Sequence, residues 1–476
     1  MDKKLLSNYL YNILYQLVKV ALPVIIVPYT MGHLGAETLG ISDFAGNIAN
    51  WFILFGVLGI NIYGNREIAR VRDNKEDLSR TFFEILTMRI FTVSIACILY
   101  IAYVSVFVTT NQIIYYLYII TIVATAFEII WFYYGVEDFK SAAIRNLIVK
   151  MIGVTFIIIF VKEPSDLWKM VLINGLSEVF GLLIMFVQLP RYIHFVRVNF
   201  ITSFKKHVGA SFTLFVPTIA ISVYTLLDQT MLGFLTNDTA NVALYKASQA
   251  FVKMFLYFIT SIGAVMLPRI SNVYHKEGGQ ESAQRYIGVT NKLALLLGVP
   301  MMVGMIAVVP YFIPWYLPDQ PEIALLIQIA SPIVLFIALS NVYGSQYMIP
   351  TGKNKMYTKT VLFGAGVNFC INLVLIPSLG AIGASIGSVI AEFCVTASQY
   401  LLIRKEIKIG WNFNVCKYFI SAGLMYVVVV FIGETIGVNL LSNLVQVGCG
   451  FCVYAITLVV IKEEFVTSVL AKLIRR

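Results

Sequence analysis

Long apolar runs alternate with short polar breaks along the whole chain. About fourteen of these runs are about 20 residues long, which is enough for one membrane-crossing helix each. Strands of a membrane barrel would instead alternate apolar and polar positions over about ten residues. The pattern therefore predicts an all-α integral membrane protein. The predicted spans are 9–32, 40–63, 82–108, 112–134, 141–161, 167–190, 209–235, 240–266, 289–312, 322–348, 357–377, 379–403, 416–436 and 440–461.

The basic residues predict the orientation of these spans. The loops after odd-numbered spans and the span ends beside them hold only Lys162 and Lys169, although the chain carries 35 lysines and arginines. Nearly all the others lie in the terminal segments and in the loops after even-numbered spans. Because cytoplasmic loops are enriched in basic residues, both termini are expected in the cytoplasm. This asymmetry accounts for the net charge of +10 without a nucleic-acid partner.

Composition excludes most enzyme classes. The chain is 59% hydrophobic and 13% charged, which leaves little sequence for a soluble catalytic domain. The N-terminus is interpreted as a retained first span, because it lacks a short apolar core followed by a cleavage site. Of the 6 cysteines in the chain, Cys449 and Cys452 have the spacing of a redox or metal pair, but they lie in an apolar run without a charged or histidine neighbour. The 4 histidines show no paired spacing. We see no P-loop and no catalytic constellation, and we expect no cofactor and no metal.

A weak internal repeat predicts the domain organisation. The segment 39–52 aligns with 241–254, and Glu178 of span 6 pairs with Glu392 of span 12. The repeat favours two six-helix lobes related by a pseudo-two-fold axis along the membrane normal, followed by two C-terminal helices. The predicted parts are an N-lobe with its cytoplasmic linker, a C-lobe, and the last two spans with an amphipathic tail on the inner membrane surface. They cover residues 1–208, 209–403 and 404–476.

Four cations within the predicted spans are candidates for a functional role, since a charge at membrane depth costs about 2.5–3.5 kcal/mol or more. They are Lys19, Arg89, Lys246 and Lys253. One interpretation is a water-filled cavity whose cations bind an anionic headgroup, since lysine and arginine suit phosphate. The other is structural. Lys246 would pair with Asp228 across a short external loop, and Arg89 would extend to the cytoplasmic surface.

Three intramembrane carboxylates are candidates for ion coupling. Glu178, Glu392 and Asp228 lie within predicted spans, where an apolar environment favours the protonated form. A hydrogen bond between packed helices would explain their presence nearly as well. Both interpretations stay open at this point.

Four segments resemble a known family. The segments 29–79, 131–154, 226–251 and 379–393 are similar to bacterial polysaccharide (oligosaccharide) flippases of the multidrug/oligosaccharidyl-lipid/polysaccharide exporter superfamily. The resemblance covers nearly the whole chain. It implies alternating access in the cytoplasmic membrane, driven by an ion gradient. The implied cargo is an undecaprenyl-pyrophosphate-linked oligosaccharide repeat unit, moved from the inner to the outer leaflet, with the polymerase and glycosyltransferases of the same pathway as candidate partners.

Two alternative functions remain. A drug/cation antiporter of the same fold would line its cavity with carboxylates, and the intramembrane lysines argue against it. A membrane polymerase or glycosyltransferase acting on the same lipid carrier would need a long external catalytic loop, and the predicted external loops, such as 108–112 and 377–380, are short. We therefore expect a transporter rather than an enzyme.

Overall fold

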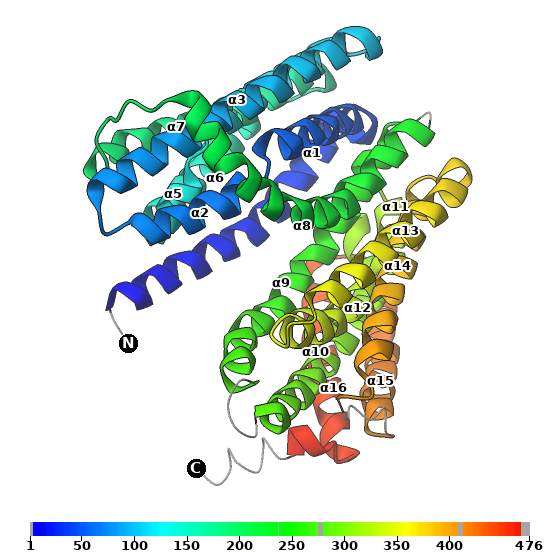
Figure 1. Cartoon of the computed structure of the whole chain (residues 1–476). Coiled ribbons are helices and arrows are strands. Elements are labelled where there is room, and N and C mark those ends of the chain that lie inside the picture. Colours follow the sequence, from blue (N-terminus) through cyan, green and yellow to red (C-terminus); the bar gives the residue numbers. More distant parts are fainter. Residues whose placement is uncertain (1–2, 237, 275–278, 408–412, 468–476) are drawn as a thin grey trace. The chain divides into compact units, whose positions relative to one another are not determined.

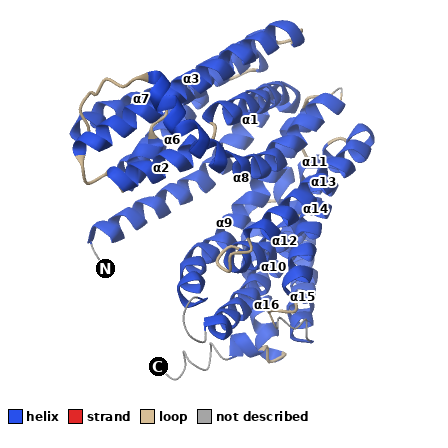
Figure 2. Cartoon of the chain, viewed as in Figure 1, coloured by secondary structure: helices blue, strands red, loops and turns tan. Residues whose placement is uncertain are grey.

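The computed structural model describes residues 3–236, 238–274, 279–407 and 413–467, with side chains except over 3–21 and at some further helical positions. Every regular element in these ranges is a helix (Figure 2). Eleven helices of the described chain are long and apolar enough to cross a membrane. The prediction of an all-helical membrane protein is thus confirmed. The number of fourteen spans and the symmetry between two lobes stay predictions.

The chain divides into two compact units, Met1–Ala243 and Leu244–Arg476 (Figure 1). The predicted boundaries of the lobes, after 208 and 403, stay a prediction, because the units are defined by internal packing alone. Before the start of α9, the first unit contains α1 (Lys3–Val57), α2 (Ile60–Val71), α3 (Lys75–Phe107), α4 (Gln112–Ala126), α5 (Ile130–Gly135), α6 (Phe139–Phe160), η1 (Pro164–Asp166), α7 (Leu167–Gln188), η2 (Leu189–Arg191) and α8 (Phe200–Leu235).

The helix α9 (Ala240–Tyr274) begins in the first unit and continues into the second. A π-helical segment, η3, follows α12 without a break. The other helices of the second unit pack in neighbouring pairs, chiefly α13 with α14 and α15 with α16. The elements after α9 are α10 (Gly279–Tyr316), α11 (Glu322–Ala330), α12 (Pro332–Ser340), η3 (Asn341–Met348), α13 (Asn354–Leu379), α14 (Ala381–Ile403), α15 (Phe413–Ile436) and α16 (Leu440–Val460).

Several predicted spans differ from the observed helices in the positions at which the helices are interrupted. The expected interruption between spans 9–32 and 40–63 is present as a sharp kink at Gly35, whose φ of 74° and ψ of 160° are not helical, so that α1 consists of two helices without an extended loop. Span 40–63 also contains a break between α1 and α2, and span 112–134 contains one between α4 and α5. Irregular backbone at membrane depth is tolerated only where protein or water satisfies it. These two breaks therefore need local partners.

An aromatic core holds the short helices α2 and α5 together in the first unit. Trp131 is stacked on Phe82 at 5.6 Å between ring centroids, and both side chains are buried. A Cβ atom at Gly64 would lie 2.5 Å from the Trp131 ring, and one at Gly135 would lie 2.5 Å from Ile68. Close packing of the two helices thus depends on glycine at both positions.

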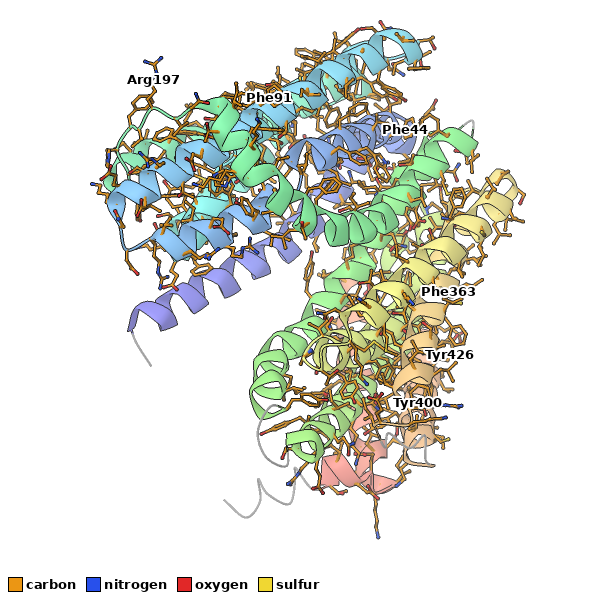
Figure 3. The ribbon with its side chains drawn as sticks, in the orientation of Figure 1. Phe44, Phe91, Arg197, Phe363, Tyr400 and Tyr426 are labelled. Atoms are coloured by element: carbon orange, nitrogen blue, oxygen red, sulfur yellow. The ribbon has the colours of Figure 1, made fainter. Side chains whose placement is uncertain are left out.

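The outer surfaces of the units carry large apolar side chains. Phe363 of α13 is 55% exposed, and Phe91 of α3 is 40% exposed (Figure 3). Soluble monomers rarely expose apolar surface on this scale. Such surfaces suit contact with lipid, as the apolar runs of the sequence predict.

Candidate functional site

The first helix break separates α1 from α2. Leu58 and Gly59 have φ values of 53° and 76°, so the backbone turns out of the helix there. The hydroxyl of Ser211 on α8 donates to the freed carbonyl of Leu58 at 2.7 Å. A Cβ atom at Gly59 would lie 2.8 Å from the carbonyl oxygen of Ser211. Glycine thus provides both the left-handed backbone and the room for α8.

The second break separates α4 from α5 and is built around Glu128. One carboxylate oxygen of Glu128 accepts from the backbone N–H of Ile130, at the start of α5. The indole N–H of Trp131 donates to the Glu128 carbonyl at 3.0 Å. The carboxylate therefore satisfies a backbone donor that the interrupted helix leaves free.

Arg89 of α3 joins the two breaks. Its guanidinium donates to the Asn61 amide oxygen at 2.6 Å, to the Thr125 carbonyl at 2.8 Å and to the Glu128 carboxylate at 3.1 Å. The Arg89 side chain is 1% exposed. In this arrangement the cation is neutralised and enclosed, so it offers no open face to a headgroup. The predicted extension of Arg89 toward the cytoplasmic surface is therefore wrong, because its partners lie at the helix breaks.

A hollow of about 280 Å³ opens beside the first break. Its polar lining comes from Asn50 of α1, Asn61 of α2, and Ser222 and Thr225 of α8. The side chains of Asn50, Asn61 and Thr225 are exposed, and no described residue that lines the hollow is charged. Polar side chains at membrane depth usually face a bundle interior or a water-filled cavity. The hollow is therefore the candidate cargo-facing surface of the first unit.

Glu178 of α7 forms an ion pair. Its carboxylate accepts from the guanidinium of Arg145 on α6 at 2.8 Å, and Arg145 is buried. A Cβ atom at Gly181 would lie 2.5 Å from Nε of Arg145, so glycine lets the arginine lie across α7. This pairing corresponds to the structural interpretation of Glu178, a link between packed helices.

Several buried polar side chains lie on α13 and α14, which pack against each other in the second unit. Asn368 and Asn372 of α13 and Ser385 of α14 are fully buried, and Glu392 is 8% exposed. The amide nitrogen of Asn372 donates to the Asn368 amide oxygen at 3.2 Å. The amide nitrogen of Asn368 and the hydroxyl of Ser385 are buried without a protein partner. Such groups need water or another polar ligand, so this helix pair contains buried polar atoms besides those of Glu392.

The remaining candidate residues lie as follows. Lys246 and Lys253 are on α9, and both side chains are exposed. Asp228 is on α8 and is 5% exposed. The side chain of Lys19 lies outside the described residues.

A third network lies near the start of α8. The imidazole of His207 contacts the hydroxyl of Tyr63 at 2.7 Å and the carboxylate of Glu84 at 2.8 Å, and Lys206 contacts the same carboxylate oxygen at 2.6 Å. His207 is 1% exposed, and its burial lowers its pKa while Glu84 opposes that change. A neutral ring with the proton on Nε2 donates to Glu84 and accepts from Tyr63, which satisfies both nitrogen atoms.

The sequence matches the family described as polysaccharide biosynthesis protein over residues 5–274. The chain belongs to this family. A protein of Escherichia coli (strain K12) that is provisionally named an O-antigen transporter is 23% identical over 413 residues, covering 84% of this chain and 96% of that protein. A protein of Shigella dysenteriae with the same provisional name is 25% identical over 397 residues, covering 81% and 96%. The resemblance drawn from the four sequence segments is confirmed.

Solved structures share the fold at low sequence identity. Lipid II flippase MurJ in an inward closed conformation superimposes with a TM-score of 0.77 at 12% identity, covering 97% of this chain and 100% of that one. An inward-facing multidrug resistance MATE family transporter of the MOP superfamily gives a TM-score of 0.60 at 12% identity, covering 83% and 94%. This member of the polysaccharide biosynthesis protein family is thus a multi-pass membrane protein with the fold of these transporters.

Sequence reasoning missed several members of these networks. Arg145 was grouped with the cytoplasmic loop charges because it lies near the start of span 141–161, yet it is buried against Glu178. Asn61 and His207 gave no signal, since isolated polar residues near span ends are common. The glycine at position 59, in the middle of an apolar run and followed by Asn61, was the available sign of a helix break.

Proposed function

We propose that this protein is a flippase for lipid-linked oligosaccharides. The observation that carries the proposal is the nearly full-length likeness to proteins provisionally named O-antigen transporters, combined with the fold of a lipid II flippase. Both kinds of relative are named for a lipid-linked or polysaccharide cargo. A lipid-linked saccharide is therefore better supported as the cargo of this protein than the drugs of MATE transporters. The cargo we propose is an undecaprenyl-pyrophosphate-linked repeat unit.

The mechanism we propose is alternating access in the cytoplasmic membrane, with both termini in the cytoplasm. The polar hollow of the first unit supports a wet path for the sugar, while the apolar outer surfaces leave the polyprenyl tail in lipid. Lys253, Lys246 and Lys19 are the proposed contacts of the pyrophosphate. We no longer include Arg89 among them, because Glu128 already neutralises it.

An ion gradient is the proposed energy source. Glu392 is the favoured coupling residue, since it is buried on α14 and the packed helices α13 and α14 contain buried polar groups that water or an ion would satisfy. Glu178 is less suited, because its charge is held by Arg145. Asp228 stays a candidate on its burial alone.

Reconstitution of the full chain tests the proposal. Liposomes would contain an undecaprenyl-pyrophosphate-linked oligosaccharide, and an impermeant lectin would report the fraction of sugar in the outer leaflet. We expect the protein to speed the exchange of cargo between leaflets well above protein-free liposomes. Cation-driven efflux of a dye without movement of the lipid-linked sugar would instead identify a drug/cation antiporter.

A further inference from the structure

The hollow beside the first helix break has the chemistry of a sugar site. We propose that it binds one neutral sugar ring of the cargo, with Asn61 and Thr225 as the residues that select it. This inference rests on the proposed function and adds to it the class of sugar and its place in the first unit. Two features of the hollow carry the inference: its lining is uncharged, and it offers both donors and acceptors.

Charge excludes an anion from this position. The described residues that line the hollow include no lysine or arginine. Arg89 contacts Asn61 but is already bonded to Glu128 at 3.1 Å. A phosphate or a sugar acid would therefore give up part of its hydration here without gaining a counter-charge, which costs free energy. A neutral polar ligand avoids that cost.

Hydrogen-bonding capacity matches a sugar hydroxyl. The amide oxygen of Asn61 accepts from Arg89 at 2.6 Å, which leaves the two N–H donors of the amide for a ligand. The hydroxyl of Thr225 donates to the Ser222 carbonyl at 3.0 Å, which leaves its lone pairs as acceptors. A sugar hydroxyl both donates and accepts, so it can bond to the two side chains at once. Neither a hydrocarbon chain nor an anion can both accept a hydrogen bond from Asn61 and donate one to Thr225.

Size and apolar surface fit one ring. Sites for drug-sized ligands measure about 300–1,000 Å³, and this hollow is slightly smaller, at about 280 Å³. Ile53, Leu54 and Val57 also line it and offer a surface for the C–H face of a pyranose. The rest of the oligosaccharide would lie outside the hollow.

Ligand binding to the full chain in nanodiscs tests this inference. The probes are neutral methyl glycosides of glucose, galactose, mannose and N-acetylglucosamine, with methyl glucuronide as the anionic probe, followed by saturation-transfer NMR. We expect a neutral glycoside to bind, and Thr225→Val to weaken it about fivefold, as expected for the loss of one neutral hydrogen bond. Asn61→Asp keeps an acceptor for Arg89 but removes both N–H donors, and it should weaken binding at least as much.

Thr213→Val is the matched control. It makes the same change on the same helix, at an exposed threonine that does not line the hollow. Binding by this variant should equal that of the native protein. Three results would each overturn the inference. They are an equal loss of affinity in Thr225→Val and Thr213→Val, tighter binding of methyl glucuronide than of the neutral glycosides, and no binding of any neutral glycoside.

The liposome assay separates this inference from the proposed function. If the native protein moves the lipid-linked cargo but binds no neutral glycoside, the sugar site is wrong and the flippase stands. In that case a lipid chain is the better occupant of the hollow. If the native protein moves no cargo, the proposed function fails, and the inference fails with it.

Discussion

Arg89 and Glu128 meet at 3.1 Å where α4 is interrupted, and the arginine side chain is only 1% exposed. The pair does more than neutralise two charges, because the guanidinium also reaches Asn61 beyond the end of α1. One cation from a third helix therefore links the two helix breaks: it donates to the Thr125 carbonyl before the second break and to the Asn61 side chain after the first, whose Leu58 carbonyl accepts from Ser211. This arrangement explains how the first unit can contain irregular backbone in a chain built for lipid.

Removing Arg89 should strongly destabilise the protein. Arg89→Leu leaves the Glu128 carboxylate without its counter-charge and the Thr125 carbonyl with its backbone donors alone, and breaking a buried pair typically costs about 3–5 kcal/mol. Arg89→Leu combined with Glu128→Gln removes both charges, while the glutamine can still accept from Ile130. We expect the double variant to unfold at a higher temperature than Arg89→Leu alone. Thermal unfolding in detergent measures this, and strictly additive losses would contradict the coupling.

Acidification should weaken the contact of α8 with α2 and α3. Burial lowers the pKa of His207, so the folded protein binds fewer protons than the unfolded chain below the ordinary histidine value of about 6.5. The contribution of neutral His207 is therefore complete above that pH and declines as the pH falls. Glu84 and Lys206 face the ring, and Glu67 lies nearby.

The measurement is the unfolding temperature at pH 7.5 and at pH 5.5. On acidification, the unfolding temperature of the native protein should fall by more than that of the His207→Gln variant, because glutamine does not titrate. If both lose the same amount, groups other than His207 govern the pH dependence.

A methyl group at Gly59 should disrupt the first helix break. Gly59→Ala places a side chain at φ 76° and a Cβ atom 2.8 Å from the Ser211 carbonyl oxygen. Backbone strain of this kind costs about 1–3 kcal/mol before the clash is counted. Gly366→Ala is the control, since its Cβ atom would meet nothing within 4 Å and alanine favours the helix. The first variant should unfold at a lower temperature, and the second should be unchanged or stabilised.

The two glutamates should differ in transport. Glu392→Gln should make the rate of cargo movement independent of the imposed ion gradient, because it removes the buried carboxylate that we propose for the coupling. Glu178→Gln should keep the gradient dependence and lower thermal stability, because it breaks the ion pair with Arg145. Liposomes with defined pH and sodium gradients distinguish these outcomes. Gradient-dependent transport by Glu392→Gln would remove this residue from the coupling mechanism.

Hydrophobic run length was enough to predict the class of fold, because a membrane requires long apolar helices whatever their packing. It could not predict the breaks at Leu58–Gly59 and before Ile130, because their stability depends on partners far away in the sequence. Arg89 lies in α3, and Ser211 lies in α8, so no local pattern connects them to the breaks.

The candidate site was less predictable than the fold. Charged residues within the predicted spans were the clearest signal in the sequence, and for this reason Arg89 and Glu178 were candidate functional residues. The structure gives both a counter-charge in the same unit, whereas the polar hollow is lined by uncharged side chains such as Asn50. Asparagine, serine and threonine occur at many membrane positions, so only their convergence in space identifies them.

Water access to the hollow tests the central claim most directly. Single cysteines at Asn50 and Thr225, in a chain whose native cysteines are replaced, would be labelled with a membrane-impermeant maleimide. A cysteine at Phe363, on the lipid-facing side of α13, is the comparison. We predict fast labelling at both hollow positions and slow labelling at Phe363, because a thiol in lipid does not ionise. Labelling of Asn50 and Thr225 as slow as that of Phe363 would show a dry surface and contradict a wet path for the sugar.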